Sequence, residues 1–123
     1  MKEMHGITLL ELLITLAIMA IIAVIAYPSY QQFILKGRRA EAQSQLLMLQ
    51  LAQEQYRLRN GLFAEDPEQL SVLDNPYYQF AVRNVAETTY TLQASAVGPQ
   101  QQDTPCTTLT VDHNDVKNPP SCW

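Results

Sequence analysis

The chain has 123 residues, 47% of them hydrophobic, and its 8 Lys and Arg against 12 Asp and Glu give a net charge of −4. This length corresponds to one domain, and a net acidic chain is not built to bind polyanions over its whole surface. Neither of the two histidines lies at a spacing typical of metal ligands, so neither a metal nor a cofactor is expected.

The first element is the apolar segment 6–27, which has no charge from Leu12 to Tyr27. A helix needs about 20 apolar residues to cross a bilayer, and within lipid only a helix satisfies the backbone of a single segment. The run is longer than the roughly 7–15 apolar residues of a secretory signal, and no small-residue cleavage site follows it. The segment therefore predicts a membrane-spanning helix.

Glu11 is the one ionisable residue in this segment, and no Lys or Arg lies within a helical turn of it. Such a charge costs at least ~2.5 kcal/mol in a membrane, whereas the helix dipole stabilises a carboxylate at the helix start by at most ~1 kcal/mol. We therefore expect a cationic partner. Cleavage after Gly6 would create an amine at Ile7, four residues from Glu11 and on the same helix face.

Pro28 follows directly. It lacks an N–H and crowds the preceding turn, which predicts a kink; a simple helix end is the alternative. A kink is favoured because residues 29–60 keep a helical pattern without further proline. Gly37 is a second weak point of this helix.

An amphipathic pattern follows Gly37 and predicts one buried stripe, with glutamines and charges on the opposite face. Asn60-Gly61 supplies a C-cap, so the predicted helix spans Ile7 to Asn60. The stripe consists of Ala42, Leu46, Leu49, Ala52 and Tyr56, flanked by Leu47 and Leu51.

The second half of the chain predicts a small antiparallel sheet. Residues 62–76 are expected to form a loop with one helical turn in 68–73. Strands are expected at 77–83, 89–96 and 107–111, with a polar loop at 98–105. The economical arrangement is α+β, with the sheet packed on the C-terminal half of the long helix, so that Tyr90, Leu92, Ala94, Ala96, Leu109 and Val111 face inward.

The segment from His5 to Glu11, followed by the apolar helix and by Ala26-Tyr27-Pro28-Ser29-Tyr30, resembles the class III leader and N-terminal helix of type IV pilins. The resemblance continues more loosely through residues 38–42 and 51–56. At the C-terminus, Cys106-x-x-Leu109-Thr110 and the final Cys122-Trp123 are similar to the minor pilins often called PilE.

This resemblance implies the type IV pilin fold, with a leader at 1–6, a transmembrane and assembly half of the helix at 7–29 and an exported globular domain at 30–123. A prepilin peptidase would cut after Gly6 and methylate Ile7, and Glu11 would pair with the N-terminal amine of a neighbouring subunit. The family usually has phenylalanine after the cut, where this chain has Ile7, but cleavage depends chiefly on the glycine.

An exported small domain with one pair of cysteines favours a Cys106–Cys122 disulfide. Closing a loop of this length contributes roughly 3 kcal/mol in the chain-entropy model. Two free thiols or a metal pair are the alternatives.

The implied function is that of a structural subunit, a minor pilin, and not an enzyme, because no phosphate loop or nucleophile–base pair is present. The implied partners are other pilin subunits, the prepilin peptidase and the assembly platform of the inner membrane. The protein would first span the bacterial inner membrane once, with its C-terminal domain in the periplasm, and then join the extracellular pilus.

Two functional alternatives share the N-terminal signature: a pseudopilin of type II secretion and a minor pilin that captures DNA. From Gly61 onward the chain has only Arg83 and Lys117 against eight Asp and Glu. Because Lys and Arg supply the attraction to phosphates, direct binding of nucleic acid is disfavoured. The cluster Lys36, Arg38 and Arg39 is expected near the membrane, inside a filament.

Two acidic groups are candidates for a calcium site: Glu65, Asp66 and Glu68, and Asp112 and Asp115. Neither group has the spacing of an oxygen cage.

Overall fold

The computed structural model describes residue 1 and residues 5–71 and 74–123, in two compact units, 1–34 and 35–123. We call the first the N-terminal unit and the second the body, and describe each by itself. Parts of two expected segments, the leader 1–6 and the helical turn in 68–73, lie outside the described residues.

Helix α1 spans Leu9–Asn60 and continues through Pro28 without interruption. It begins two residues later than predicted because Thr8 caps it: the Thr8 hydroxyl accepts from the Glu11 N–H at 3.2 Å, as an N-cap residue does. Its end is as predicted, with Gly61 at φ +77° and its N–H bonded to the Arg57 carbonyl.

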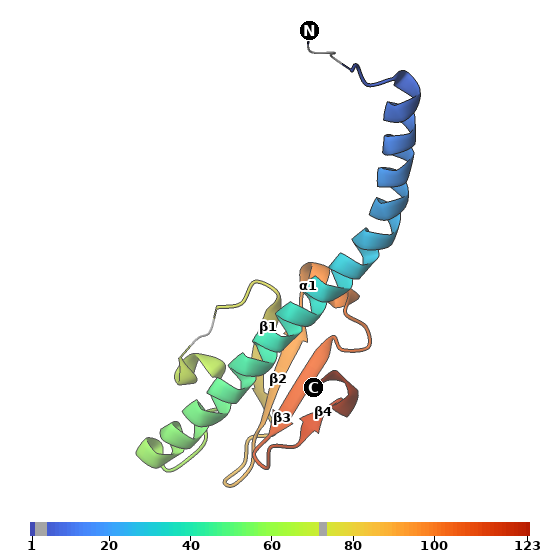
Figure 1. The fold of residues 1–123 in the computed structure, drawn as a ribbon. Coiled ribbons are helices and arrows are strands. Elements are labelled where there is room, and N and C mark those ends of the chain that lie inside the picture. Colours follow the sequence, from blue (N-terminus) through green and yellow to red (C-terminus); the bar gives the residue numbers. More distant parts are fainter. Residues whose placement is uncertain (2–4, 72–73) are drawn as a thin grey trace. The chain divides into compact units, whose positions relative to one another are not determined.

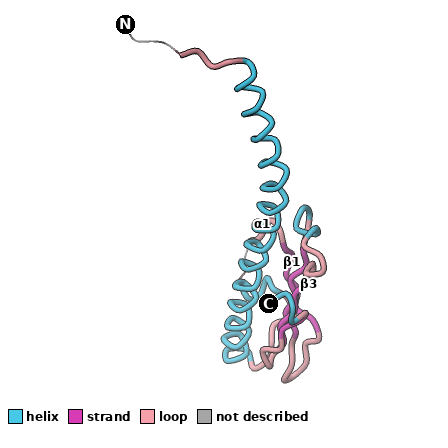
Figure 2. Tube along the Cα trace, turned by 45° about the vertical axis from the view of Figure 1, so that its right-hand side comes forward, coloured by secondary structure: helices cyan, strands magenta, loops and turns pink. Residues whose placement is uncertain are grey.

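Four antiparallel strands form one sheet in the order β1-β2-β3-β4, which lies along the body half of α1 (Figures 1 and 2). The three predicted strands are confirmed to within two residues at each end. The fourth consists of two residues, too few for a sequence pattern, and was not predicted. The strands are β1 Tyr78–Arg83, β2 Thr91–Ala96, β3 Thr108–Asp112 and β4 Lys117–Asn118.

The sheet register aligns its inward residues in rows. Val82 pairs with Leu92, and Leu92 pairs with Val111 on the next strand. These residues pack with the helix stripe at Ala42, Leu46 and Leu49 in one apolar core. Since fully burying a large aliphatic side chain contributes about 1.5–3 kcal/mol, this face is what stabilises the body. The inward strand positions predicted from the alternation are all buried.

The outer face of the helix differs from the prediction in one residue. Gln53 is fully buried instead of solvated. Its amide donates to the Ala64 carbonyl and accepts from the Ala64 N–H, both at 2.9 Å. Both polar ends of Gln53 are thereby satisfied, which is what allows a glutamine to lie in the core. These two hydrogen bonds hold the segment that follows the end of α1 against the helix.

The polar loop predicted at 98–105 is also corrected. It contains the 3-10 helix η2 at Gly98–Gln102 and buries Gln100 and Asp103. Two further 3-10 helices, η1 at Pro67–Leu70 and η3 at Pro120–Cys122, complete the described elements.

Candidate functional site

The bond between Gly6 and Ile7 lies before α1 begins, in non-helical chain. Ile7 is 80% exposed, and apart from the chain neighbours of Gly6 no described residue has an atom within 4 Å of the position that a Cβ at Gly6 would take. Because Thr8 caps the helix just after this bond, the segment around it is held out of regular structure. The bond is therefore accessible to another protein.

Glu11 lies in the first turn of α1 and is exposed. Its backbone is satisfied: the N–H bonds to Thr8, and the carbonyl accepts from the Thr15 hydroxyl at 2.7 Å. Within the described chain, its carboxylate forms no ion pair. The carboxylate is therefore left for a group from outside the chain.

The N-terminal unit leaves its apolar surface uncovered. The described chain contains one helix long and apolar enough to cross a membrane, and none of its most apolar window is buried. Its exposed side chains include Leu13, Leu16, Ile18 and Ile22, each more than half exposed. A soluble core helix would bury such residues, so this surface needs lipid or protein around it.

The basic cluster at the start of the body is held by the body itself. The Arg38 guanidinium lies 3.7 Å from the centroid of the Tyr77 ring. Arg39 Nε lies 3.5 Å from the Asp103 carboxylate, and both side chains are largely buried. Two of the three cations expected inside a filament therefore have partners within the same chain.

Gln100 extends this contact into a buried network that the sequence pattern did not reveal. Its amide nitrogen donates to the Leu35 carbonyl at 2.9 Å and to the Tyr78 hydroxyl at 3.0 Å. Its buried carbonyl oxygen has no hydrogen-bond partner among the described residues. Burial raises the pKa of both Tyr78 and Asp103, while Arg39 acts against this rise at each group. A glutamine in a polar loop carries no signal of such a role.

The Cys106–Cys122 disulfide is present as predicted. Gln43 of α1 donates to the Cys122 carbonyl at 2.6 Å, which ties the C-terminal loop to the helix. Trp123 donates to the Asn118 carbonyl, and Lys117 lies 5.5 Å from the centroid of the Trp123 ring. The chain end is therefore fixed to the body by covalent and polar contacts.

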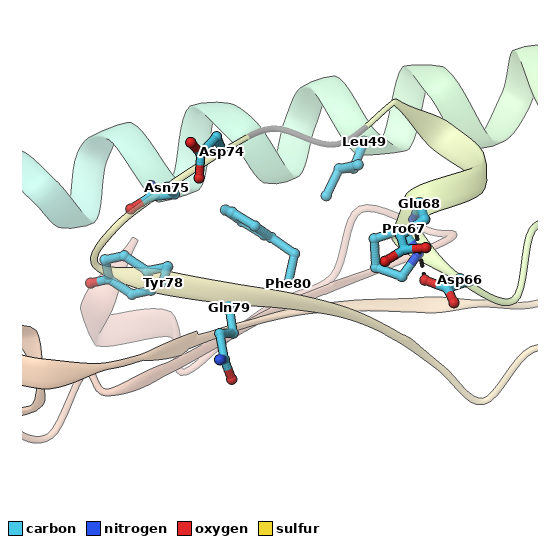
Figure 3. A pocket seen from close by; sticks show the side chains of 9 residues that line it. All are labelled: Leu49, Asp66, Pro67, Glu68, Asp74, Asn75, Tyr78, Gln79 and Phe80. Atoms are coloured by element: carbon cyan, nitrogen blue, oxygen red, sulfur yellow. Dashed lines mark hydrogen bonds between the residues drawn. The ribbon is translucent and has the colours of Figure 1, made fainter.

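Three of the five acidic residues considered as calcium ligands, Asp66, Asp112 and Asp115, have structural roles. Asp66 caps η1 by accepting from the Glu68 N–H, at the edge of a cavity of about 330 Å³ beside β1 (Figure 3). Asp112 accepts from two N–H groups of its own turn, and Asp115 pairs with Lys117 at 3.6 Å. The described residues include no group of three or more His, Cys, Asp or Glu placed to hold a metal.

Two family models match the chain. Residues 1–27 match the prokaryotic N-terminal methylation motif. Residues 28–110 match the family described as type IV minor pilin ComP, DNA uptake sequence receptor. The first covers the segment with the accessible Gly6–Ile7 bond and Glu11, and the second covers α1 from Pro28 and the sheet as far as β3.

Solved structures support the same grouping. The chain is similar to a type IV pilin from Shewanella oneidensis, with 34% identity, a TM-score of 0.59, and coverage of 72% of this chain and 97% of that one. Its fold also matches the non-core minor pilin PilV of Neisseria meningitidis, with 23% identity, a TM-score of 0.57, and coverage of 70% and 86%. No curated protein matches the chain significantly.

Proposed function

The chain belongs to the family described as type IV minor pilin ComP, DNA uptake sequence receptor, and we propose that it enters or primes a type IV pilus through its apolar N-terminal helix. As a minor type IV pilin it is a structural subunit and not an enzyme. The observation that carries the proposal is the uncovered apolar surface of the N-terminal unit, in which the unpaired carboxylate of Glu11 is the one charge between Leu9 and Ile34.

Processing is the first proposed step. The prepilin peptidase removes the leader 1–6 by cutting after Gly6 and methylates the new amine of Ile7. The accessibility of this bond and the methylation motif over residues 1–27 support the step. Because Ile7 replaces the more usual phenylalanine, mass spectrometry of the mature chain should test for the methyl group at Ile7 directly.

Assembly through Glu11 is the second proposed step. A carboxylate surrounded by apolar side chains is stabilised strongly by an opposite charge, and the cut at Gly6 supplies such a charge on every mature subunit. We assign the amine of Ile7 on a neighbouring subunit as the partner of Glu11. The pairing sets the position of one subunit against the next.

The proposed location follows from the helix. Residues 7–29 span the inner membrane before assembly, with the exported domain 30–123 in the periplasm, and the assembly platform then transfers the subunit into the extracellular pilus. Pro28 lies inside the continuous helix and removes one backbone hydrogen bond there. We propose that this position is the kink, and a Pro28→Ala variant with unchanged pilus assembly and elasticity would refute it.

The experiment is a comparison of Glu11→Ala with Glu41→Ala, which removes an exposed carboxylate from the body half of the same helix. Mass spectrometry should find both variants cut after Gly6 and methylated at Ile7. Glu11→Ala should be missing from sheared pili, whereas Glu41→Ala should be present at the level of the unmodified chain.

A mature chain that still begins at Met1 would refute the proposal, because no amine would then arise at Ile7. Deletion of the protein separates a minor pilin from a secretion pseudopilin. Few or no pili with normal secretion is the result expected here, and blocked secretion with intact pili would support the pseudopilin.

DNA capture is the second candidate function, favoured by the description of the family. The charges of the body act against it: Arg39 and Lys117 pair with carboxylates of the chain, and Arg38 lies over Tyr77. A gel shift with the full-length chain in detergent at low salt tests it. Tight binding that Arg83→Ala or Lys117→Ala weakens would establish DNA capture, and we expect none.

A further inference from the structure

A groove of about 390 Å³ lies between the body half of α1 and the turn that joins β3 to β4. One wall consists of Leu47 and Leu51, the floor of Tyr90, and the rim of Glu54, His113 and Asp115. Gln50 of α1 donates to the Asp112 carbonyl at 3.1 Å and fixes the two sides of the groove to each other. No residue of the groove takes part in the processing or pairing steps described above.

The apolar wall is left open to solvent. Leu47 is 41% and Leu51 is 68% exposed, although the nearby Leu46 and Leu49 of the same helix are buried in the core. The exposed row continues beyond the groove to Leu58, which is 87% exposed. An apolar row of this kind on one helix face favours contact with another protein surface.

Tyr90 forms the floor and has an unused hydrogen-bonding group. The residue is only 2% exposed, with its ring held by Phe63 and His113 at centroid distances of 4.6 and 6.3 Å. Among the described residues its hydroxyl makes no hydrogen bond, and the hydroxyl is not one of the fully buried unpartnered atoms, so solvent reaches it. The hydroxyl is thus free to bond to a group that enters the groove.

The electrostatics of the groove are negative. Burial, together with the carboxylates of Glu54, Asp112 and Asp115, raises the pKa of Tyr90 to about 12. The Asp112 carboxylate accepts hydrogen bonds from two backbone N–H groups of its own turn, and Asp115 forms an ion pair with Lys117. Within the described chain, Glu54 is exposed and forms no ion pair. The groove therefore presents a free carboxylate beside an unpartnered phenol and two leucines.

We propose that this groove binds the side chain of a lysine or arginine from a neighbouring pilin subunit. The aliphatic stem of such a side chain packs on Leu47 and Leu51. Its cationic end donates to Glu54 and to the Tyr90 oxygen. The identity of the occupant rests on the proposed function, in which the chain is surrounded by other pilins.

The charges of the chain agree with this occupant. Arg59 and Arg83 are exposed and form no ion pair with any described residue, so a second copy carries free cations. The row from Leu47 to Leu58 extends the contact beyond a single side chain. A free small cation would satisfy the carboxylate but would leave this row uncovered.

The chemistry of the groove is tested by titrating n-butylguanidinium into the full-length chain in detergent micelles, followed by NMR. Signals of Tyr90, His113 and the Leu47 and Leu51 methyl groups should shift saturably. Glu54→Gln should weaken the apparent affinity about tenfold. Glu87→Gln, which removes an exposed carboxylate between β1 and β2, should not change it. Absent shifts, equal shifts with n-butanol, or an unchanged affinity in Glu54→Gln would overturn the proposal.

The occupant is tested by placing a photo-cross-linking amino acid at Leu51 in cells. In sheared pili, the adduct should join Leu51 to a peptide of a pilin beside a lysine or arginine, and Glu54→Gln should reduce its yield. An adduct with another class of protein, or none, would overturn the assignment of the occupant. Absence of the chain from the pili would instead refute the proposed function and, with it, the identity of the occupant. The micelle titration tests whether the groove binds a cationic side chain, independently of the proposed function.

Discussion

The two halves of α1 have the same backbone structure and opposite surroundings. Every described residue from Leu9 to Tyr30 is exposed, whereas the body half buries Leu35, Ala42, Leu46, Leu49 and Gln53. The body half is stabilised by the sheet packed on it. The N-terminal half has no such support within the chain, so its stability depends on lipid or on other subunits. One helix therefore combines a half that is part of the folded body with an uncovered half, to which we assign the proposed assembly role.

The largest effect is expected at the leader. Gly6→Leu should abolish cleavage, so that the precursor accumulates and the chain is missing from pili. Because a Cβ at Gly6 would meet no atom of the described residues within 4 Å, chain neighbours apart, the loss would come from processing and not from folding. Immunoblotting of membranes and sheared pili measures it, with Lys2→Gln in the same leader as the control. A cleaved Gly6→Leu chain would contradict the assignment of the cut.

The second prediction separates the two halves of the helix. Leu46→Ala should lower the free energy of unfolding of the body by about 2–5 kcal/mol, since it leaves a cavity in the core. Leu16→Ala, at a position 56% exposed, should leave that free energy unchanged and lower only the amount incorporated into pili. Urea denaturation of the full-length chain in micelles measures the first quantity. Equal losses of stability would remove the distinction between the halves.

The third prediction concerns the C-terminal loop. Replacing both Cys106 and Cys122 by serine should destabilise the body by roughly 3 kcal/mol, because the unfolded chain gains the freedom of the open loop. Thermal unfolding should show a lower Tm for the double variant than for the unmodified chain. A reductant should lower the Tm of the unmodified chain alone. Membrane insertion of the N-terminal half should be unaffected.

The smallest effect is expected at Asp103, where the pH dependence carries the information. Burial raises the folded pKa of Asp103 above the ordinary value of 3.8, against the opposing effect of Arg39. The folded state therefore binds the proton of Asp103 more tightly than the unfolded chain does. The stability gained in this way is fully present below pH 3.8 and is lost as the pH rises through the folded pKa.

Asp103→Asn should accordingly gain stability relative to the unmodified chain as the pH rises from about 3 to about 6. Urea denaturation of both chains at both pH values measures the difference in their free energies of unfolding. The other carboxylates are the same in the two chains, so their contributions cancel. A relative stability that falls with rising pH would mean that the ion pair with Arg39 outweighs burial.

Most of the fold could be predicted because the relevant patterns are local. The 3.6-residue spacing identified the buried stripe of α1, and alternation identified three strands and their inward faces. Sequence reasoning failed where a polar side chain is buried. Gln53, Gln100 and Asp103 look like surface residues because their partners lie outside the local pattern: Ala64 is 11 residues from Gln53, and Leu35 is 65 residues from Gln100.

The candidate sites divide in the same way. Gly6, Ile7 and Glu11 stand out because their chemistry depends on neighbours within a few residues of an apolar run. The groove at Tyr90 does not, because its residues come from three separate segments: four from α1, Tyr90 from just before β2, and two from the β3–β4 turn. No spacing along the chain marks such a site.

By itself the sequence determined the long helix, its apolar and amphipathic halves, the processing signature and the pair of cysteines, because each depends on residue type and short-range periodicity. Only the tertiary structure decided which glutamines are buried, which cations are neutralised within the chain and where a free carboxylate lies beside an unpartnered phenol. These features depend on contacts between segments tens of residues apart, whose geometry exists only once the sheet has packed on the helix.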